Sequence, residues 1–308
     1  MTRRLEFLAK VLGGQLARSL DLTALGVLGL VLGGLCAAAA LVRGAAIPRE
    51  GNLLETASFD GAVGVFILTL AVLALGVSWT PRGRRVWGGF LIALTLYSYG
   101  IETLQAFRGL DPRFSRVAGP LDQAAGGLFF LAAVGIMVCF IVLAVKYFRA
   151  EPDPVTVAVR YGAAASLVAF GVGIWMSLVT NGRHVPEAGN LLFLHATGFH
   201  GLQAVPLVAL LLRWAGPPES AARRRVHLAG MAWLGACLAI ALQSGSGRGI
   251  TEPSPATAAT VVLLLVFGVT AFLALLAWLS TAPPWSGPEP ATARALDHGP
   301  PTTSGSTR

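Results

Sequence analysis

The stretch LTALGVLGLVLGGLCAAAALV (residues 22–42), fenced by Asp21 and Arg43, holds no charged residue. The hydrocarbon core of a bilayer is about 30 Å thick, and a helix of about 20 apolar residues crosses it. The whole chain shares this character, since 55% of its 308 residues are hydrophobic and 12% are charged. A soluble domain of this length carries far more charge. The sequence therefore predicts an all-α integral membrane protein.

The same criterion applied along the chain predicts eight transmembrane helices. The third range is the least apolar, because it carries Glu102. The eight predicted ranges are 22–42, 60–79, 86–107, 123–145, 159–180, 191–212, 226–244 and 256–280.

The charges indicate how the chain lies in the membrane. If the N-terminus is inside, 16 of the 23 Lys and Arg residues fall on cytoplasmic segments and 7 fall outside. The positive-inside rule then predicts that both termini are cytoplasmic. The net charge of +8 is explained by the basic residues on the predicted cytoplasmic segments, so no nucleic-acid partner is predicted. The Arg-rich, Lys-poor chain carries no recognisable organelle signal, and a bacterial-type cytoplasmic (inner) membrane is expected.

The two ends of the chain differ from the hydrophobic middle. Residues 1–21 combine leucines at helical spacing with basic residues, which is typical of an amphipathic helix on the inner membrane surface; a frayed basic leader is the alternative. Residues 282–308 are rich in Pro, Ser, Thr and Gly, and predict a disordered cytoplasmic tail. The three cysteines lie singly in three predicted helices, and we expect them to be small, buried apolar residues of the core. They are Cys36, Cys139 and Cys237.

The chain also repeats itself. Gly51-Asn52-Leu53-Leu54 recurs 138 residues later as Gly189-Asn190-Leu191-Leu192. Three further echoes follow at a displacement of 140: Phe59-Asp60-Gly61 with Phe199-His200-Gly201, Arg84-Arg85-Val86 with Arg224-Arg225-Val226, and Arg108-Gly109 with Arg248-Gly249. This predicts two four-helix units, residues 22–150 and 151–281, that insert with the same orientation about a pseudo-twofold axis along the membrane normal.

Polar groups collect at one depth, in the predicted outer leaflet. Such groups are costly inside a bilayer unless they face a partner or a cavity, so they are candidates for a ligand-binding site. Ser98, Glu102 and Gln105 share one face of a helix, whereas Asp60 is expected to open the second helix. Asp60 and His200 are equivalent in the repeat and are expected to face each other. The candidates are Asp60, Ser98, Glu102, Gln105, His195, His200, Gln203 and Gln243.

Two of these candidates are also possible ligands of a haem or a transition metal. His195 and His200 are five residues apart, which separates them by about 140° around a helix. They can share one metal ion only if His195 lies in the non-helical entry to its helix. The sequence shows no P-loop, HExxH or CxxC motif.

Three functions remain open at this point. The first is an outward-opening polar site between the two units that binds a small solute or ion, for transport or for sensing. The second is a membrane redox or metal protein that uses His195 or His200. The third is a non-catalytic membrane subunit or assembly factor, with a membrane protein partner or a second copy, whose polar groups pair with each other or with Arg108 or Arg248. Whether the protein is an enzyme is not predicted.

The segment from Leu194 to Pro206, with His-x4-His-x2-Gln, and the segment Glu102 to Gly109 together resemble uncharacterised bacterial polytopic membrane proteins. The resemblance covers the predicted second, third, sixth and seventh helices. It implies a multi-pass membrane fold. That group has no established activity, so the resemblance implies no function.

Overall fold

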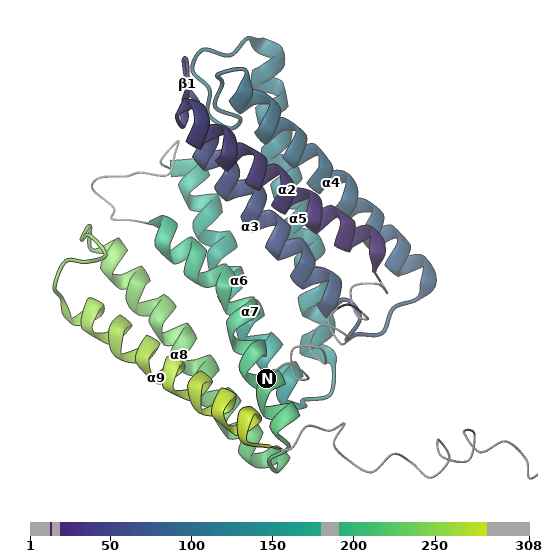
Figure 1. Cartoon of the computed structure of the whole chain (residues 1–308), viewed down its shortest axis with the longest axis vertical. Coiled ribbons are helices and arrows are strands. Elements are labelled where there is room, and N and C mark those ends of the chain that lie inside the picture. Colours follow the sequence, from purple (N-terminus) through teal and green to yellow (C-terminus); the bar gives the residue numbers. More distant parts are fainter. Residues whose placement is uncertain (1–12, 14–18, 180–190, 282–308) are drawn as a thin grey trace, which may run out of the picture.

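The structure is a computed structural model that describes residues 13, 19–179 and 191–281. These residues form a bundle of long helices with one short antiparallel strand pair (Figure 1). The helices are α2 (Leu20–Arg43), α3 (Leu53–Leu73), α4 (Pro81–Phe107), α5 (Pro120–Arg149), α6 (Pro154–Val179), α7 (Leu191–Ala215), α8 (Glu219–Gly245) and α9 (Pro255–Ser280); the strands are β1 (Ala46–Ile47) and β2 (Gly51–Asn52). The predicted surface helix in residues 1–21 and the predicted tail 282–308 lie outside the described residues, except for the start of α2.

Seven of the helices are long and apolar enough to cross a membrane, which confirms a multi-pass membrane protein. The helix α4 is not among these seven. It carries three arginines near its start and a glutamate near its end, namely Arg82, Arg84, Arg85 and Glu102. Each of the eight predicted ranges nevertheless overlaps one helix of the structure, although the range 60–79 runs past the end of α3 at Leu73.

The second helix begins earlier than predicted. The Asn52 side chain accepts hydrogen bonds from the backbone N–H groups of Leu54 and Glu55, and it donates one to the Glu55 carboxylate. This cap starts α3 at Leu53 rather than at residue 60, because it satisfies N–H groups that lack a helical partner. The expectation that Asp60 opens this helix is therefore wrong: Asp60 is its eighth residue and lies two turns inside.

Helices pack most closely in two pairs, α2 with α3 and α6 with α7. Glycines make the approach possible. A Cβ atom on Gly64 of α3 would lie 2.7 Å from the carbonyl oxygen of Gly26, and one on Gly162 of α6 would lie 2.8 Å from that of Gly201. Small residues of this kind let backbones come together where lipid supplies no hydrophobic driving force.

A cluster of aromatic rings lies where the two halves of the chain meet. Phe66 of α3 and Phe140 of α5 meet Phe170 of α6 and Phe199 of α7, with ring centroids 4.8 to 6.0 Å apart. The most buried members of the surrounding core, such as Ile67 and Leu70, are fully shielded. The polar site that the sequence predicts between the two units therefore does not occupy this part of their contact.

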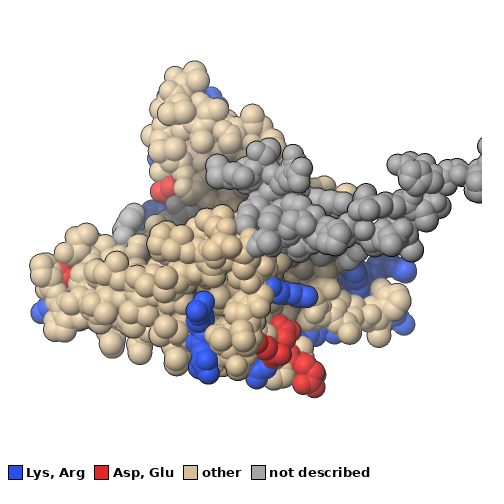
Figure 2. All heavy atoms as spheres, turned by 60° about the horizontal axis from the view of Figure 1, so that its bottom comes forward, with Lys and Arg blue, Asp and Glu red and all other residues tan. Residues whose placement is uncertain are grey.

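The two ends of the bundle differ in charge. The hairpin end contains the strand pair, the α4–α5 loop and the α8–α9 loop, and its described residues carry nearly equal numbers of basic and acidic side chains. The basic ones are Arg43, Arg49, Arg108, Arg113, Arg116 and Arg248, and the acidic ones are Glu50, Glu55, Asp60, Glu102, Asp111, Asp122 and Glu252. The opposite end, here called the basic end, has Arg82, Arg84, Arg85, Lys146, Arg149, Arg160, Arg213, Arg223, Arg224 and Arg225 against Asp21, Glu151, Asp153 and Glu219. Figure 2 brings the basic end forward and shows Lys and Arg side chains spread over it.

Candidate functional site

Asp60 is the most deeply buried acidic side chain in the described part of the chain, with no exposed surface. It lies on α3 where that helix packs against α2 and α4. The Thr103 hydroxyl of α4 donates a hydrogen bond of 2.9 Å to Asp60 Oδ2. The other carboxylate oxygen, Oδ1, has no hydrogen-bond partner. A buried acceptor without a donor is costly, so this atom marks an incomplete polar site.

Glu102 of α4 is the second acidic group of this site and is only 1% exposed. The Arg113 guanidinium, from the loop between α4 and α5, donates to Glu102 Oε2 at 2.5 Å. The same guanidinium lies over two aromatic rings, 5.0 Å from the centroid of Phe59 and 5.7 Å from that of Phe129. Three helices and one loop therefore hold this ion pair.

The charges of the site do not balance among the described residues. Asp60 lies within electrostatic reach of both Glu102 and Arg113, so two carboxyl groups share one guanidinium. Removing an unpaired charge from water costs several kcal/mol. The imbalance disappears when one carboxyl group holds a proton or when a second cation enters.

Two further groups border the carboxylates. Tyr99, one turn before Glu102 and Thr103 on α4, is 1% exposed, and its hydroxyl has no hydrogen-bond partner. The Cys36 thiol of α2 is buried and lies within electrostatic reach of both Asp60 and Glu102. The site thus contains two oxygen atoms, Asp60 Oδ1 and the Tyr99 hydroxyl, that are available to a ligand or a water molecule.

The loop that carries Arg113 is fixed by its own contacts. Asp111 Oδ1 accepts the backbone N–H groups of Arg113 and Phe114. Glu50, in the turn between β1 and β2, accepts hydrogen bonds from the Ser115 hydroxyl at 2.5 Å and from the backbone N–H of Arg116 at 2.9 Å. The bond from Ser115 lowers the pKa of the Glu50 carboxyl below its usual value, with a further contribution from the Arg116 N–H.

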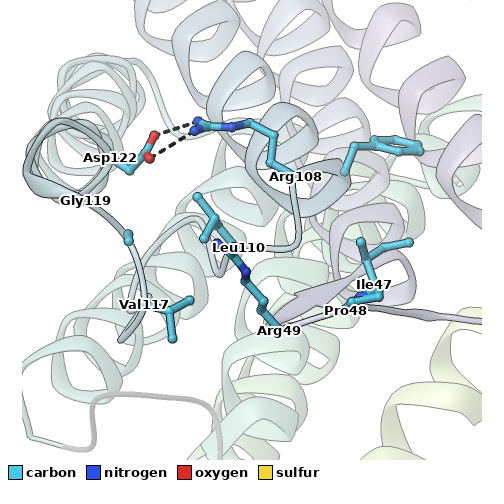
Figure 3. A pocket seen from close by; sticks show the side chains of 10 residues that line it. Ile47, Pro48, Arg49, Arg108, Leu110, Val117, Gly119 and Asp122 are labelled. Atoms are coloured by element: carbon cyan, nitrogen blue, oxygen red, sulfur yellow. Dashed lines mark hydrogen bonds and ion pairs between the residues drawn. The ribbon is translucent and has the colours of Figure 1, made fainter.

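A shallow cavity of about 540 Å³ lies beside this loop at the hairpin end (Figure 3). Arg108 and Asp122 form a two-pronged ion pair on its wall, at 2.6 and 3.1 Å. Gln105, a predicted site residue, is 3% exposed and donates to Asp122 at 2.9 Å while it accepts from Arg108. Gln105 therefore joins the end of α4 to the start of α5.

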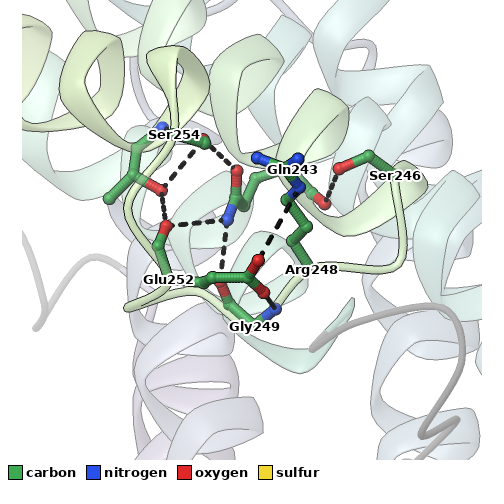
Figure 4. Close-up of polar contacts among 7 residues, drawn as sticks. Gln243, Ser246, Arg248, Gly249, Glu252 and Ser254 are labelled. Carbon is green, nitrogen blue, oxygen red and sulfur yellow. Dashed lines mark hydrogen bonds and ion pairs between the residues drawn. The ribbon is translucent and has the colours of Figure 1, made fainter.

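Gln243 makes a similar connection between a helix end and a loop in the second half of the chain (Figure 4). It lies near the end of α8, and its amide donates to the backbone oxygens of Gly249 and Glu252. Its carbonyl oxygen accepts the hydroxyl of Ser254, the residue that caps α9. These bonds give Gln243 a role in joining α8 to α9, and no bond of this glutamine reaches Asp60 or Glu102 in the described part of the chain.

Three other candidates also make contacts between or within helices. Ser98 donates to the backbone oxygen of Leu94 on its own helix. His195 Nδ1 lies 2.8 Å from the backbone oxygen of Ala169 on α6. Gln203 of α7 donates to the Thr69 hydroxyl of α3 at 3.0 Å, which links the two halves.

The two histidines have different surroundings. His195 is the fifth residue of α7, and its ring packs edge-on against Phe199, so it is inside the helix rather than in a non-helical entry. His200 is exposed on the same helix. Asp60 is enclosed by α2, α3 and α4, and no described contact joins it to His200, contrary to the expected facing pair. Among the described residues there is no group of three His, Cys, Asp or Glu side chains arranged to hold a metal ion; haem or metal ligation stays a prediction.

The residues that complete the site are not among those predicted from the sequence. Arg113, Thr103, Phe59 and Phe129 surround the two carboxylates, yet only the first carries a charge. A buried glutamate needs a cation within reach, and that rule could have selected Arg113 among the basic residues of the nearest loop. Nothing in the sequence pattern distinguishes the two phenylalanines from lipid-facing ones.

No family model, no curated protein and no solved structure matches this chain.

Proposed function

We propose that this protein binds a small solute or ion at Asp60 and Glu102, on the outer side of a membrane, as a transporter or a sensor. The observation that carries the proposal is Asp60 Oδ1, a fully buried carboxylate oxygen without a hydrogen-bond partner, close to a second buried carboxylate, Glu102. Intramembrane acidic groups are expensive and mark ion or substrate sites by default. The Arg113 side chain, 19% exposed, lies between the pair and the surface and gives a route of entry.

The proposal includes an orientation. With the basic end in the cytoplasm, the excess of Lys and Arg obeys the positive-inside rule, and the hairpin end with the site faces outward. In this arrangement α4 is an eighth span whose three arginines lie at the cytoplasmic surface, where long basic side chains reach the headgroups. The expected membrane is the cytoplasmic membrane, with both termini inside.

We also retain the two four-helix units. Support comes from the ends of α4 and α8: the N–H of Leu110 bonds to the Gln105 oxygen as that of Arg248 bonds to the Gln243 oxygen. The residues just before Leu110 and Arg248 are Gly109 and Gly247, which have similar positive φ angles of 75° and 74°. These pairs are 138 residues apart, so this helix end favours a displacement of 138 over the 140 taken from Arg108-Gly109. At 138, Asp60 corresponds to Gly198, which leaves the carboxylate site in the first unit alone.

Access is favoured from one side. On the basic-end side of Asp60, the contact between α3 and α4 is built from fully buried apolar side chains such as Ile67, Leu70 and Leu91. The Thr95 hydroxyl of α4, which is buried and has no hydrogen-bond partner, is the polar group nearest to this layer on α4. A sensor needs no path beyond the site, whereas a transporter must open this layer by moving α4 against α3.

The test is a thermal-stability screen of the detergent-purified protein against inorganic ions, organic ions and small neutral solutes. We expect at least one of them to raise the melting temperature of the wild type in a saturable way, and the shift to vanish in Asp60→Asn and Glu102→Gln. Glu252→Gln is the matched control, because Glu252 is an exposed carboxylate at the same end. A shift that persists in both site variants, or no shift with any solute, contradicts the proposal.

A second candidate is a non-catalytic membrane subunit or assembly factor. It is favoured by the bonds of Gln105, His195 and Gln243, all of which hold helices or loops together. Isolation from native membranes separates the two candidates. A stoichiometric partner that survives the Asp60→Asn exchange supports the subunit, and a protein isolated alone that responds to a ligand supports the binding site.

A further inference from the structure

Arg113 occupies surroundings that suit an organic cation. Its guanidinium lies beside a pair of rings, Phe59 of α3 and Phe129 of α5, whose centroids are 5.5 Å apart with the rings tilted by 47°. Glu102 accepts from the guanidinium on one side. Aromatic faces together with carboxylates are the chemistry by which proteins recognise guanidinium and ammonium groups.

A second buried carboxyl group, Asp60, lies beside the ion pair of Arg113 and Glu102. One guanidinium pairs with Glu102, while Asp60 remains nearby with Oδ1 unpartnered and with no exposed surface. An inorganic cation would use the carboxylates and leave the two rings without a role. An organic cation uses both the rings and the charge, so the ring pair favours that class.

The loop does not depend on the Arg113 side chain for its position. Asp111 holds the backbone of residues 113 and 114, and Glu50 holds Ser115 and the backbone of Arg116. The Arg113 side chain can therefore leave the carboxylate while the loop stays in place. Its partial exposure, against 1% for Glu102, puts the exit on the surface.

We infer that Arg113 is an internal occupant of an organic-cation site formed by Glu102, Asp60, Phe59 and Phe129, and that a guanidinium or ammonium compound displaces it. The inference rests on the proposed function and names the ligand class for that site. In the free protein Arg113 neutralises Glu102 and closes the site. When the ligand enters, its cation replaces the guanidinium beside the two rings, and the Arg113 side chain turns to solvent.

The experiment removes the Arg113 guanidinium by substitution and adds a free organic cation in its place. Arg113→Ala is purified and titrated with methylguanidinium and with tetramethylammonium at constant ionic strength, with melting temperature and calorimetric heat as readouts. Two matched controls lose an arginine at the same end of the bundle. Arg43→Ala removes a guanidinium that lies 5.0 Å over a single ring, Phe107, and Arg108→Ala removes one paired with Asp122.

We expect Arg113→Ala to melt below the wild type and to recover with either cation in a saturable way, and both controls to show no saturable recovery. Adding Phe59→Leu or Phe129→Leu to Arg113→Ala should weaken the response several-fold, because the cation–π contact is lost. The wild type should bind the same cations at least about tenfold more weakly, since the ligand must first displace Arg113. The inference is overturned if folded Arg113→Ala shows no response, or if Arg43→Ala or Arg108→Ala recovers equally.

If Arg113→Ala does not fold, the wild type carries the test: saturable binding that Phe59→Leu weakens supports the inference, and no binding overturns it. The outcome is separable from that of the proposed function. A wild-type response to an inorganic ion or neutral solute that needs Asp60 and Glu102, with no organic cation bound by Arg113→Ala, leaves the proposed function standing and removes this inference. No response of any kind removes both.

Discussion

Thr103 and Asp60 meet across the contact between α4 and α3. The threonine hydroxyl donates a hydrogen bond of 2.9 Å to one carboxylate oxygen of Asp60, and the other oxygen has no donor. A single hydroxyl does not stabilise a buried carboxylate, which needs several donors or a cation. The arrangement is complete only with a proton or a ligand, and this need connects the packing of two helices to a binding function.

Replacing Asp60 with asparagine should stabilise the protein in the absence of ligand. The exchange keeps the acceptor for Thr103 and removes the excess negative charge, so we expect a gain of about 1 to 3 kcal/mol, the usual penalty of an unsatisfied buried group. Melting temperature in detergent measures it. Asp122→Asn is the control and should lower stability slightly, because it breaks the pair with the half-exposed Arg108. A lower melting temperature for Asp60→Asn would show that the carboxylate is satisfied.

Glu102 and Arg113 should show a larger coupling energy than Arg108 and Asp122. The first pair contains a side chain that is 1% exposed, whereas the second is 48% and 22% exposed. Low exposure reduces screening by water, so double-mutant cycles with Glu102→Gln and Arg113→Ala should give about 1 to 3 kcal/mol. The coupling energy of the surface pair should be smaller, because water screens it. Equal coupling in both cycles would mean that Arg113 is already free of the site.

Gly64 and Gly61 lie one turn apart on α3 and should differ sharply in tolerance to alanine. A Cβ on Gly64 meets the Gly26 oxygen at 2.7 Å and the Leu30 nitrogen at 2.9 Å, while one on Gly61 has nothing within 4 Å. Because backbone atoms cannot move aside, Gly64→Ala should cost about 1 to 3 kcal/mol. Gly61→Ala should leave the melting temperature unchanged. Comparable losses would argue against the close pairing of α2 with α3.

The clamp between Glu50 and the α4–α5 loop should weaken in acid. The pKa of the Glu50 carboxyl is lower in the folded protein than the ordinary value of 4.5, because the Ser115 hydroxyl and the Arg116 N–H donate hydrogen bonds to the ionised form. A carboxyl with a depressed folded pKa stabilises the fold above its unfolded pKa and loses this contribution as pH falls through the folded value. Amide exchange at Arg116, corrected for its intrinsic pH dependence, should accelerate below about pH 4.5. Glu50→Gln should show fast exchange already at neutral pH, and a pH-independent difference would contradict the clamp.

The helices themselves could be predicted from the sequence, because about 20 apolar residues in a row have few alternatives in a bilayer. The start of α3 was missed by seven residues, since hydropathy does not register the Asn52 cap. The prediction grouped eight polar side chains into one site only because they are expected at the same depth in the membrane. It does not distinguish a glutamine that closes a loop, such as Gln243, from a carboxylate that lacks a partner, such as Asp60.

The composition of the site depends on contacts between helices and a loop, which sequence spacing does not encode. Glu102 and Thr103 are neighbours in sequence, yet one faces Arg113 and the other faces Asp60. Phe59 and Phe129 become part of the site only because α3 and α5 approach there. The expected pairing of Asp60 with His200 rested on a displacement of 140 that the helix ends do not follow.

The most direct test of the central claim is the chemical modification of Arg113→Cys in oriented vesicles, with the three buried cysteines replaced. Membrane-impermeant thiol reagents of equal size and opposite charge are added to the outer side. The account predicts labelling from outside, at least about tenfold faster for the cationic reagent because Asp60 and Glu102 attract it, with the preference reduced by Asp60→Asn. Equal rates for the two reagents, or labelling from the cytoplasmic side alone, would contradict an outward-facing carboxylate site.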